Sequence, residues 1–423
     1  MRYLYSFLFY LALPFIFLRL IWRSRRAPLY RKRLGERLGF YPWQLENCIW
    51  VHAVSMGETI AAVPLIKSLQ LQYPQSPVLV TNMTVTGSER VKAILGDTVY
   101  NAYIPYDVPD AIARFFQQIK PRILIVMETE LWPNLFLACQ QRHIPIVIAN
   151  ARLSEKSAKG YQVISSLTKK LLGMVTKILV QNETDAERFI ALGALQEQVY
   201  VTGSLKFDLQ LPIDMTEKSE TLRKKLGEQR LIWIAASTHP GEDEIILAAH
   251  HAIRKKFSNA LLILVPRHPE RFDSVAALVR ENNFIVARRS DNALCDNNTA
   301  VYLGDTMGEM MLMYSVCDVA FVAGSFATIG GHNVIEPAVL HKPVITGTHV
   351  FNFAEVTDLL LAAKGMVKVN HADELAETVS RFFSDPEYRQ KTGENAWQVV
   401  EKNRGALHRQ LESIVTILSL INP

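Results

Sequence analysis

Cysteine is scarce in this chain of 423 residues. The four cysteines are Cys48, Cys139, Cys295 and Cys317, and no two of them form a C-x-x-C pair. A disulfide framework or a zinc ribbon needs cysteines at paired spacings. The scattered pattern therefore argues against both and fits a reducing compartment.

Several catalytic signatures are also missing. The chain has no G-x-x-x-x-G-K-[ST] loop, no H-E-x-x-H and no D-x-D triplet. These absences argue against a P-loop nucleotide site and a zincin, and weigh against a metal-bridged nucleotide-sugar site. The eleven histidines are dispersed; His332, His341 and His349 share one region but lack a clear ligand register. We expect neither a metal nor a cofactor.

Basic charge is concentrated in one short stretch. Residues 19–37 hold eight Lys/Arg and one Glu, a local charge of +7, whereas the whole chain carries +5 and the remainder therefore −2. A nucleic-acid-binding protein more often carries its basic excess on the folded domain. We therefore expect no nucleic-acid partner and look to the hydrophobic segment beside the charges.

That segment, residues 3–22, has about the length that a helix needs to cross a bilayer. A cleaved signal peptide is the alternative, but only Arg2 precedes the segment and no small-x-small site follows it. The positive-inside rule places Arg23, Arg25, Arg26 and residues 31–33 in the cytoplasm. The pattern predicts a single-pass anchor with the rest of the chain on the cytoplasmic side, and the same charges favour anionic head groups.

Short apolar runs alternate with helical patterns along most of the chain, which predicts doubly wound parallel sheets. The predicted strands of the first half are residues 49–54, 78–81, 122–127, 145–149, 177–180 and 199–201. Those of the second half are residues 231–236, 261–265, 284–287, 300–303, 318–323, 343–345 and 366–369. Residues 208–230 are polar and indicate a linker, so the fold class is α/β with two Rossmann-like halves and a cleft between them.

Ligands of such sheets bind beyond the carboxyl ends of the strands, and the two halves differ there. The first half offers carboxylates: Glu58, Glu128 and Glu130. Glu58 could be a general base or a helix-capping acid, and local sequence favours capping. Glu128 is equally compatible with a ligand group and a first-turn acid. Lys206, at the junction of the halves, could be solvated or could reach the cleft.

The second half offers cations and glycines. Residues 318–337 predict a strand, a glycine loop and a helix that starts at His332 and Asn333, an arrangement that suits an anion. Glu336 could accept hydrogen bonds from the vicinal hydroxyls of a ribose. Arg267 suits a phosphate, or pairs with Glu270 on the surface. A glycine loop that serves only close packing is the plainer interpretation.

Several motifs together resemble the 3-deoxy-D-manno-octulosonic acid (Kdo) transferases of lipopolysaccharide synthesis. The motifs are RKRLGER at residues 31–37, VSMGET at 54–59, METELWPN at 127–134, TGSLKFD at 202–208, VPRHPER at 265–271, GDTMGE at 304–309 and GGHN at 330–333. The resemblance runs from the apolar segment to the last helix. It implies a GT-B fold, cytidine 5'-monophosphate-Kdo (CMP-Kdo) as donor, a lipid A precursor (lipid IVA) as acceptor, and inversion without a bound metal.

The resemblance also implies domain limits. We expect a transmembrane anchor over residues 1–23, an acceptor-binding Rossmann-like domain over 24–207, a linker over 208–230, and a CMP-Kdo-binding Rossmann-like domain with the C-terminal helix over 231–423. The location expected for a bacterial member is the inner membrane.

Site residues follow from the resemblance one by one. Glu58 matches the family's general base, and Glu128 and Lys206 match groups that support the transition state. The nucleotide-binding segments match Pro266, Arg267, Met307, Gly308, Glu309, Asn333, Val334, Ile335 and Glu336. Residues 326–329 and Met56 differ from the residues that are more common in the family at these positions. These differences affect the expected shape of the loop and the expected details of acceptor binding.

Two other functions remain compatible with the residues alone. One is another GT-B nucleotide-sugar enzyme, either a transferase of a different sugar or an epimerase. The other is a membrane-tethered binding module without catalysis. Preference for cytidine over uridine nucleotides would separate the first from a Kdo transferase, and absence of nucleotide release with any lipid acceptor would indicate the second.

Overall fold

The computed structural model describes residues 2–25, 28–209, 211–212, 214–292 and 294–421. Arg26 of the basic stretch, and Gln210 and Ile213 of the expected linker, lie outside these ranges. The chain divides into two compact units. Unit 1 comprises Met1–Asp208 and Arg404–Pro423, and unit 2 comprises Leu209–Asn403.

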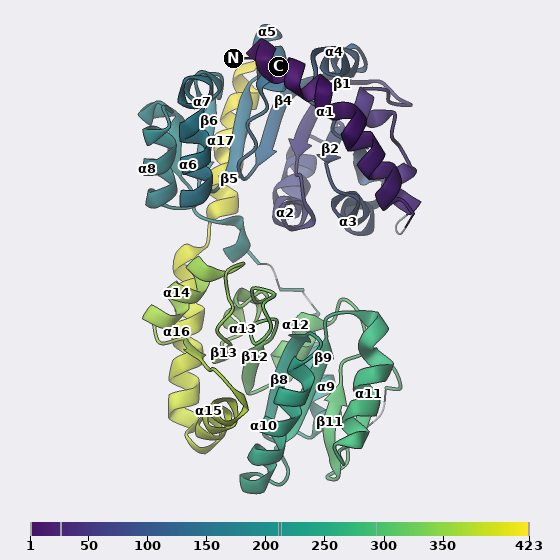
Figure 1. Ribbon diagram of the computed structural model, residues 1–423. Coiled ribbons are helices and arrows are strands. Elements are labelled where there is room, and N and C mark those ends of the chain that lie inside the picture. The colour runs from purple at the N-terminus through teal and green to yellow at the C-terminus, as the bar shows by residue number, and fades with distance from the viewer. Residues whose placement is uncertain (1, 26–27, 210, 213, 293, 422–423) are drawn as a thin grey trace. The chain divides into compact units, whose positions relative to one another are not determined.

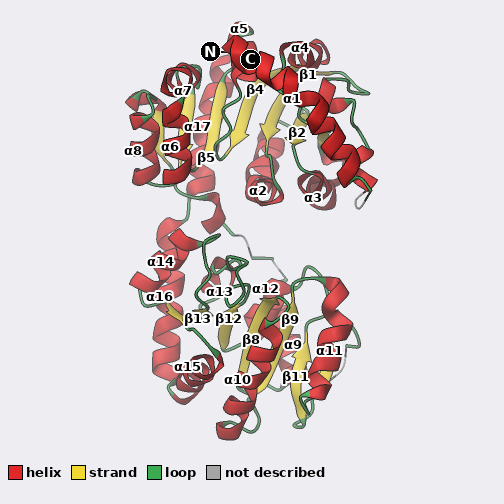
Figure 2. Ribbon diagram, viewed as in Figure 1, coloured by secondary structure: helices red, strands yellow, loops and turns green. Residues whose placement is uncertain are grey.

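Unit 1 is built on a seven-stranded sheet in which every pairing is parallel, in the order β3-β2-β1-β4-β5-β6-β7 (Figures 1 and 2). Its strands are β1 (Leu45–His52), β2 (Val78–Asn82), β3 (Tyr100–Tyr103), β4 (Ile119–Met127), β5 (Ile146–Ala151), β6 (Lys177–Val180) and β7 (Val199–Val201). Helices cover both faces, which is why the central strands are apolar throughout rather than alternating.

Neighbouring residues of β1 show how the two faces are filled. Trp50 packs into one core with α4 (Pro109–Gln118), α5 (Pro133–Gln141), α7 (Ser165–Leu172) and α8 (Glu183–Ala191). Ile49 packs into the other core with α2 (Met56–Gln72), α3 (Val85–Leu95) and α17 (Ala406–Ile421). Both side chains are fully buried, and burial of a side chain of this size contributes about 1.5–3 kcal/mol.

Unit 2 repeats this architecture with a second seven-stranded parallel sheet, in the order β10-β11-β9-β8-β12-β13-β14. Its strands are β8 (Ile232–Thr238), β9 (Leu261–Pro266), β10 (Ile285–Arg288), β11 (Thr299–Leu303), β12 (Val319–Val322), β13 (Val344–Thr346) and β14 (Met366–Lys368). Its helices are α9 (Met215–Leu226), α10 (Glu242–Lys256), α11 (Phe272–Glu281), α12 (Met310–Val316), α13 (Ile335–Val339), α14 (Ala354–Ala362), α15 (Ala372–Ser384) and α16 (Pro386–Asn403). The two parallel sheets confirm the expected α/β class with two Rossmann-like halves.

Three expectations about organisation need correction. β3 was not predicted, because its sequence YNAY is half polar and its first residue is exposed. The segment expected to be only a linker contains α9, which packs on α12 of unit 2. The last helix, α17, was expected in the second domain but belongs to unit 1.

The reason for the last correction is visible in α17 itself (Figure 1). Its apolar face, including Ile414 and Leu418, is buried in the same core as β1, and the helix contacts α2, β4 and β5. Both carboxylate oxygens of Asp208 accept hydrogen bonds at its start, from the N–H groups of Gly405 (2.7 Å) and Leu407 (2.6 Å). An apolar helix face goes to the sheet that can bury it, irrespective of its position in sequence.

The apolar N-terminal segment forms one helix, α1 (Arg2–Arg23), which is long and apolar enough to cross a membrane. One edge touches the rest of unit 1: the Ser6 hydroxyl hydrogen-bonds the Asn134 side chain, and the rings of Phe9 and Phe17 pack against Tyr106. Most of its large apolar side chains, such as Phe15 (73% exposed), face outward. The helix has the composition of a membrane anchor or a signal segment.

Candidate functional site

In each sheet the strand order changes direction beside the first strand of the unit, and the candidate residues gather there. In unit 1 the reversal lies between β1 and β4, whose carboxyl ends lead to Glu58 and Glu128. In unit 2 it lies between β8 and β12, which lead to His239 and the loop at Gly324. Reversal points leave a crevice beyond the strand ends, where ligands of doubly wound sheets bind.

Glu58 lies in the first turn of α2 and is nearly buried, with 9% of its surface exposed. Its carboxylate accepts hydrogen bonds from the N–H groups of Val54 (2.8 Å) and Ser55 (3.2 Å), while the Ser55 hydroxyl accepts from the N–H of Glu58 (3.4 Å). This is a capping box, so the capping interpretation of Glu58 is correct as far as geometry goes.

Besides capping α2, the Glu58 carboxyl group has a shifted pKa. Burial raises its pKa to about 7; the charges of Glu128 and Glu130 also raise it, while the hydrogen bonds from Ser55 and Val54 lower it. A carboxyl group with this pKa exchanges a proton near neutral pH, which suits a general base. The structure thus brings three rim carboxylates into electrostatic contact.

Glu128 directly follows β4 in a left-handed backbone conformation (φ 57°), and its N–H bonds the Ala149 carbonyl. A residue other than glycine in this region costs on the order of 1–3 kcal/mol. Asn150 in β5 and Ser237 in β8, each the last residue but one of its strand, share this feature. Such strain at strand ends is a common mark of a functional rim.

Glu130 is held by the Trp132 indole, whose N–H donates to Oε2 at 3.0 Å. Burial raises its pKa, the Trp132 bond lowers it, and the charge of Glu128 raises it. The sequence identified Glu130 as a rim carboxylate. Its fixed orientation and its electrostatic coupling to Glu58 become visible only in the three-dimensional structure.

Lys206 lies in a single helical turn, Leu205–Phe207, next to β5. The Leu205 N–H donates to Asn150 Oδ1 (3.0 Å), and Gln410 of α17 bonds both the Asn150 N–H and the Gly203 carbonyl. Asn150 is fully buried. The lysine is therefore carried by a turn that is fastened to the carboxyl end of the sheet, rather than by a flexible linker.

The rim of unit 2 holds three histidines and Arg267. The rings of His239 and His332 lie parallel, with their Nε2 atoms 2.8 Å apart, and His268 meets His239 edge-on at 5.4 Å between centroids. Burial lowers the pKa of His332 to about 4, and the positive charge of Arg267 contributes. Burial also lowers the pKa of His239.

Arg267 follows β9 and lies near enough to lower the pKa of both imidazoles and of Glu336. It forms no ion pair with Glu270, nor with another carboxylate of the described residues. The surface salt bridge considered from the sequence is thus not observed. Arg271, four residues on, is instead committed to Asp243 and the Thr238 carbonyl.

The loop after β12 is organised by Glu242, a residue that no sequence pattern singled out. Its buried carboxylate accepts four backbone N–H groups. The donors are Gly324 (2.8 Å), Ser325 (3.0 Å), Phe326 (3.0 Å) and His239 (3.0 Å). The loop N–H groups expected to cradle a ligand at Gly324–Phe326 are therefore occupied by the protein's own carboxylate.

Gly324 has a functional reason to be glycine. Its φ is +72°, and a Cβ there would lie 2.7 Å from the His332 ring. Any other side chain would push His332 away from His239. The glycine loop thus serves close packing, and the packing it permits forms the histidine pair.

The helix after this loop differs from the expected one. It begins at Ile335, spans five residues, and is α13 rather than a helix starting at His332. Asn333 turns the chain, accepting from the Ile335 N–H (3.1 Å) and donating to Glu336 Oε1 (3.2 Å). Burial raises the pKa of Glu336 to about 7, opposed by Asn333 and Arg267. A helix of five residues has only a small dipole, so side chains rather than the helix dipole determine the local electrostatics.

Pro266, Met307, Gly308 and Glu309 lie on neighbouring strand ends of the same sheet edge. Pro266 ends β9, while the Met307 side chain is 60% exposed and Gly308 has a φ of +84°. The Glu309 carboxylate is engaged by Arg289 through two hydrogen bonds of 2.7 and 2.9 Å. Glu309 therefore fixes this loop, and only its exposed neighbours are available to a ligand.

Among the described residues, no group of three or more His, Cys, Asp or Glu side chains could hold a metal ion. The rim of unit 1 presents the carboxylates of Glu58, Glu128 and Glu130, and the rim of unit 2 presents Arg267 and three histidines.

Solved structures establish the class of the fold. HepE from Anabaena in complex with UDP matches 88% of this chain and 99% of its own, with a TM-score of 0.55 and 13% identity. MnaA from S. aureus with UDP matches 88% and 97%, with a TM-score of 0.54 and 15% identity. The protein has a GT-B-like fold of two Rossmann-like halves, as the sequence predicted.

Sequence comparisons identify the family. Residues 32–209 match the family described as 3-deoxy-D-manno-octulosonic-acid transferase (kdotransferase), and residues 229–399 match glycosyl transferases group 1. The 3-deoxy-D-manno-octulosonic acid transferase of Haemophilus influenzae is 45% identical, covering 97% of both chains, and that of Bordetella pertussis is 34% identical, covering 95% and 96%. The chain belongs to the Kdo transferase family and is a glycosyltransferase.

Proposed function

We propose that this enzyme transfers Kdo from CMP-Kdo to a lipid A precursor, lipid IVA, with inversion at the anomeric carbon and Glu58 as the general base. The observation that carries the proposal is the buried Glu58 carboxylate with a pKa of about 7 at the β1–β4 reversal point. Family membership supports Kdo as the sugar, and the burial and position of Glu58 support its role as the base.

The chemical step balances without a metal. An acceptor hydroxyl attacks the anomeric carbon of Kdo, and its proton passes to Glu58. The bond between that carbon and the phosphate oxygen breaks, its electron pair goes to the phosphate, and CMP leaves. One displacement with one base inverts the configuration, and base catalysis of this kind typically contributes 10²–10⁴-fold.

Two supporting groups come after the base in sequence. We assign Glu128 and Lys206 to stabilisation of the transition state, in which the sugar carbon gains positive and the phosphate negative charge. Both lie at the carboxyl edge of the first sheet. Glu128 is held there by its own N–H, which bonds the Ala149 carbonyl of β5, and Lys206 by the N–H of the adjacent Leu205, which donates to the Asn150 side chain of β5. Preorganised charges of this kind cost no rearrangement during reaction.

The donor site is assigned to the rim of unit 2. Arg267 is available to the CMP phosphate, and neutral imidazoles beside it offer N–H donors. Asn333 and Glu336 are assigned to the ribose hydroxyls, since Glu336 retains a free carboxylate oxygen besides the one bonded to Asn333. The remaining nucleotide-binding segments are assigned to Pro266, residues 307–309 and residues 334–335. Glu309 contributes indirectly, because its bonds to Arg289 fix the shape of the loop.

The membrane role is assigned to α1. Its outward apolar side chains suit the hydrocarbon region, and Arg25 beyond its end is exposed and suits anionic head groups. We place the helix in the inner membrane, with both units on the cytoplasmic side. Arg33, which the charge pattern also assigned to head groups, is instead bonded within unit 1.

The test is a transfer assay with full-length protein in membranes. CMP-Kdo and lipid IVA are supplied, and products are weighed by mass spectrometry while CMP release is measured. The proposal predicts a mass increase by whole Kdo units, equal release of CMP, and the opposite anomeric configuration by NMR. UDP-N-acetylglucosamine serves as the control donor; turnover of that donor in place of CMP-Kdo, or retained configuration, would contradict the proposal.

A further inference from the structure

Asn82 ends β2 and is completely buried beside the loop that carries Glu58. Its side-chain nitrogen donates to the Ala53 carbonyl (2.7 Å) and to Thr59 Oγ1 (3.0 Å). Its side-chain oxygen accepts from Asn101 Nδ2 (2.8 Å). The amide therefore has partners on every side and a single orientation, since exchange of its O and N would oppose like groups.

The first of these bonds acts on the peptide group that holds the base. The carbonyl of the Ala53–Val54 peptide accepts from Asn82, and the N–H of the same peptide donates to Glu58 Oε2 at 2.8 Å. A hydrogen bond at the oxygen of an amide polarises it and strengthens its N–H as a donor. Asn82 is thus separated from the Glu58 carboxylate by one peptide unit.

The second bond acts on the other end of the same loop. The Thr59 hydroxyl accepts from Asn82 and donates to the Ser55 carbonyl (2.9 Å), and Ser55 is the N-cap of α2. Asn82 therefore holds both the entry into the loop and the first helical turn. Loss of its amide would release the two segments whose separation fixes Glu58.

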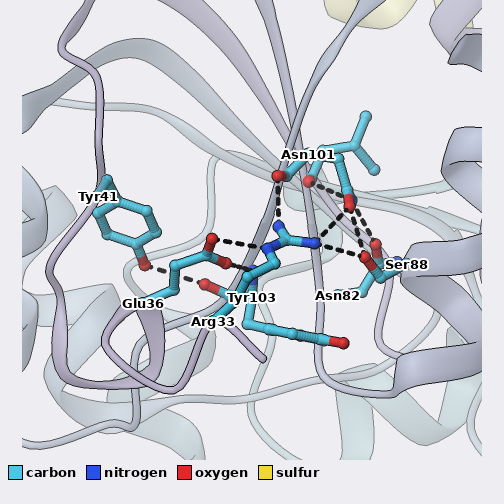
Figure 3. Close-up of polar contacts among 8 residues, drawn as sticks. Arg33, Glu36, Tyr41, Asn82, Ser88, Asn101 and Tyr103 are labelled. Atoms are coloured by element: carbon cyan, nitrogen blue, oxygen red, sulfur yellow. Dashed lines mark hydrogen bonds and ion pairs between the residues drawn. The ribbon is translucent and has the colours of Figure 1, made fainter. Parts of the chain in front are cut away.

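Beyond Asn82 the bonds continue to the segment that follows α1 (Figure 3). The Arg33 guanidinium donates to Ser88 (2.9 Å), to Asn101 Oδ1 (3.2 Å) and to the Asn101 carbonyl, while its Nε pairs with Glu36 at 2.7 Å. The other Glu36 oxygen accepts from the Tyr103 N–H (2.7 Å).

Arg37 makes a parallel connection. It is 3% exposed, donates to the carbonyl of Met83 (2.9 Å), and its guanidinium lies over the Tyr103 ring at 4.2 Å. Met83 follows Asn82 directly, and its N–H bonds the Val54 carbonyl. Of the basic stretch, Arg33 is therefore tied to Asn101 of β3, and Arg37 to Met83, the residue that follows β2.

We propose that Asn82 is a positioning residue for Glu58, and that Asn101 and Arg33 connect it to the segment that joins the membrane helix. The inference rests on the proposed role of Glu58 as the base. Asn82 touches no reacting atom in this scheme; it fixes where the carboxylate lies and which donors face it.

The primary test is Asn82→Asp, which keeps the shape but replaces the donating nitrogen by an oxygen. Full-length enzyme is assayed with saturating CMP-Kdo and lipid IVA across the pH range. We expect kcat to fall roughly 10- to 100-fold through misplacement of the base, with the KM for CMP-Kdo unchanged. Loss of the donor and gain of a nearby acid raise the pKa of Glu58, so the acidic limb of the rate profile should move to higher pH.

The matched control is Asn47→Asp, the same change at an exposed position near the amino end of β1. It should leave rate and pH profile unchanged. Thr59→Val removes the hydroxyl between Asn82 and Ser55 with little change of shape. It should move the acidic limb of the rate profile to higher pH, but by less than Asn82→Asp does. It provides the test if Asn82→Asp does not fold, as judged by its melting curve.

A double variant separates positioning from general stability. If Asn82 acts through Glu58, Asn82→Asp should cause no further loss of rate in a Glu58→Gln enzyme, because the group it positions is gone. The inference would be overturned, with Glu58 still the base, if the rate losses of the two single variants multiplied in the double variant. It would also be overturned if the acidic limb did not shift in folded Asn82→Asp and Thr59→Val enzymes. Near-normal transfer by Glu58→Gln alone would instead overturn the base assignment.

Discussion

Glu242 provides a quantitative test of the loop that follows β12. Glu242→Gln keeps the size of the side chain but replaces one acceptor oxygen by a donating NH₂ group. Because each oxygen accepts two backbone N–H groups, two of the four donors lose their acceptor whichever way the amide turns. A buried N–H without a partner costs roughly 1–3 kcal/mol, so the change should destabilise unit 2 by roughly 2–6 kcal/mol.

That loss is large enough to measure by thermal unfolding. For a unit of this size, 1 kcal/mol corresponds to roughly 2–4 °C in Tm, so the transition of unit 2 should move down by roughly 4–24 °C. Differential scanning calorimetry of the full chain in detergent is the assay. The KM for CMP-Kdo should also rise, because the histidine pair beside the loop loses its support.

The control is Glu244→Gln, two residues on. Glu244 also lies in the first turn of α10, so it experiences the same helix dipole, but its side chain is exposed. The dipole accounts for only about 0.3–1 kcal/mol. A Tm change for Glu242→Gln no larger than that of the control would refute the claim that this carboxylate organises the loop.

Three further predictions concern single residues. Glu128→Gly should slow transfer without lowering Tm, since glycine relieves the left-handed backbone, and a lower Tm would contradict the inferred strain. Asp208→Ala should cost about 1 kcal/mol and lower the Tm of unit 1, because it uncaps α17; an unchanged Tm would contradict the capping role. His250 is buried with its pKa lowered to about 3, so its stabilising effect is lost as pH falls below the unfolded value near 6.5. Between pH 7 and 5, the wild type should lose about 2 kcal/mol more free energy of unfolding than His250→Gln, and equal losses in urea titrations would contradict this.

The strands were largely predictable from the sequence because a buried parallel strand is an uninterrupted apolar run. β6 and β7 were predicted to the residue, and the other predicted strands to within a few residues. β3 was missed for the same reason: as an edge strand it is polar and half exposed. The edge strand β7 was nevertheless predicted, because its sequence VYV is apolar although Tyr200 and Val201 are exposed.

The candidate rim could be predicted because glutamates and cations follow strands directly in sequence. Glu58 and Arg267 were found in this way. Contacts between distant segments could not be found, which is why Glu242, Arg289 and Asn82 were missed. Each is an ordinary polar residue whose importance comes from a partner on another strand end.

The basic stretch after α1 shows a different limit. Charge counting treated its arginines as one group facing the membrane. The structure separates Arg33 and Arg37, which are bonded inside unit 1, from the exposed Arg25. Net charge describes a segment, but it does not say which side chains reach the solvent.

The most direct test of the proposed mechanism is the pH dependence of Kdo transfer by wild-type and Glu58→Gln enzymes under single-turnover conditions. The control is Glu46→Gln, the same change at an exposed position on β1. The account predicts a wild-type acidic limb near pH 7, the same limb in the control, and a loss of roughly 10²–10⁴-fold in Glu58→Gln with donor binding retained. A Glu58→Gln enzyme with near-normal rate and an unchanged limb would contradict it.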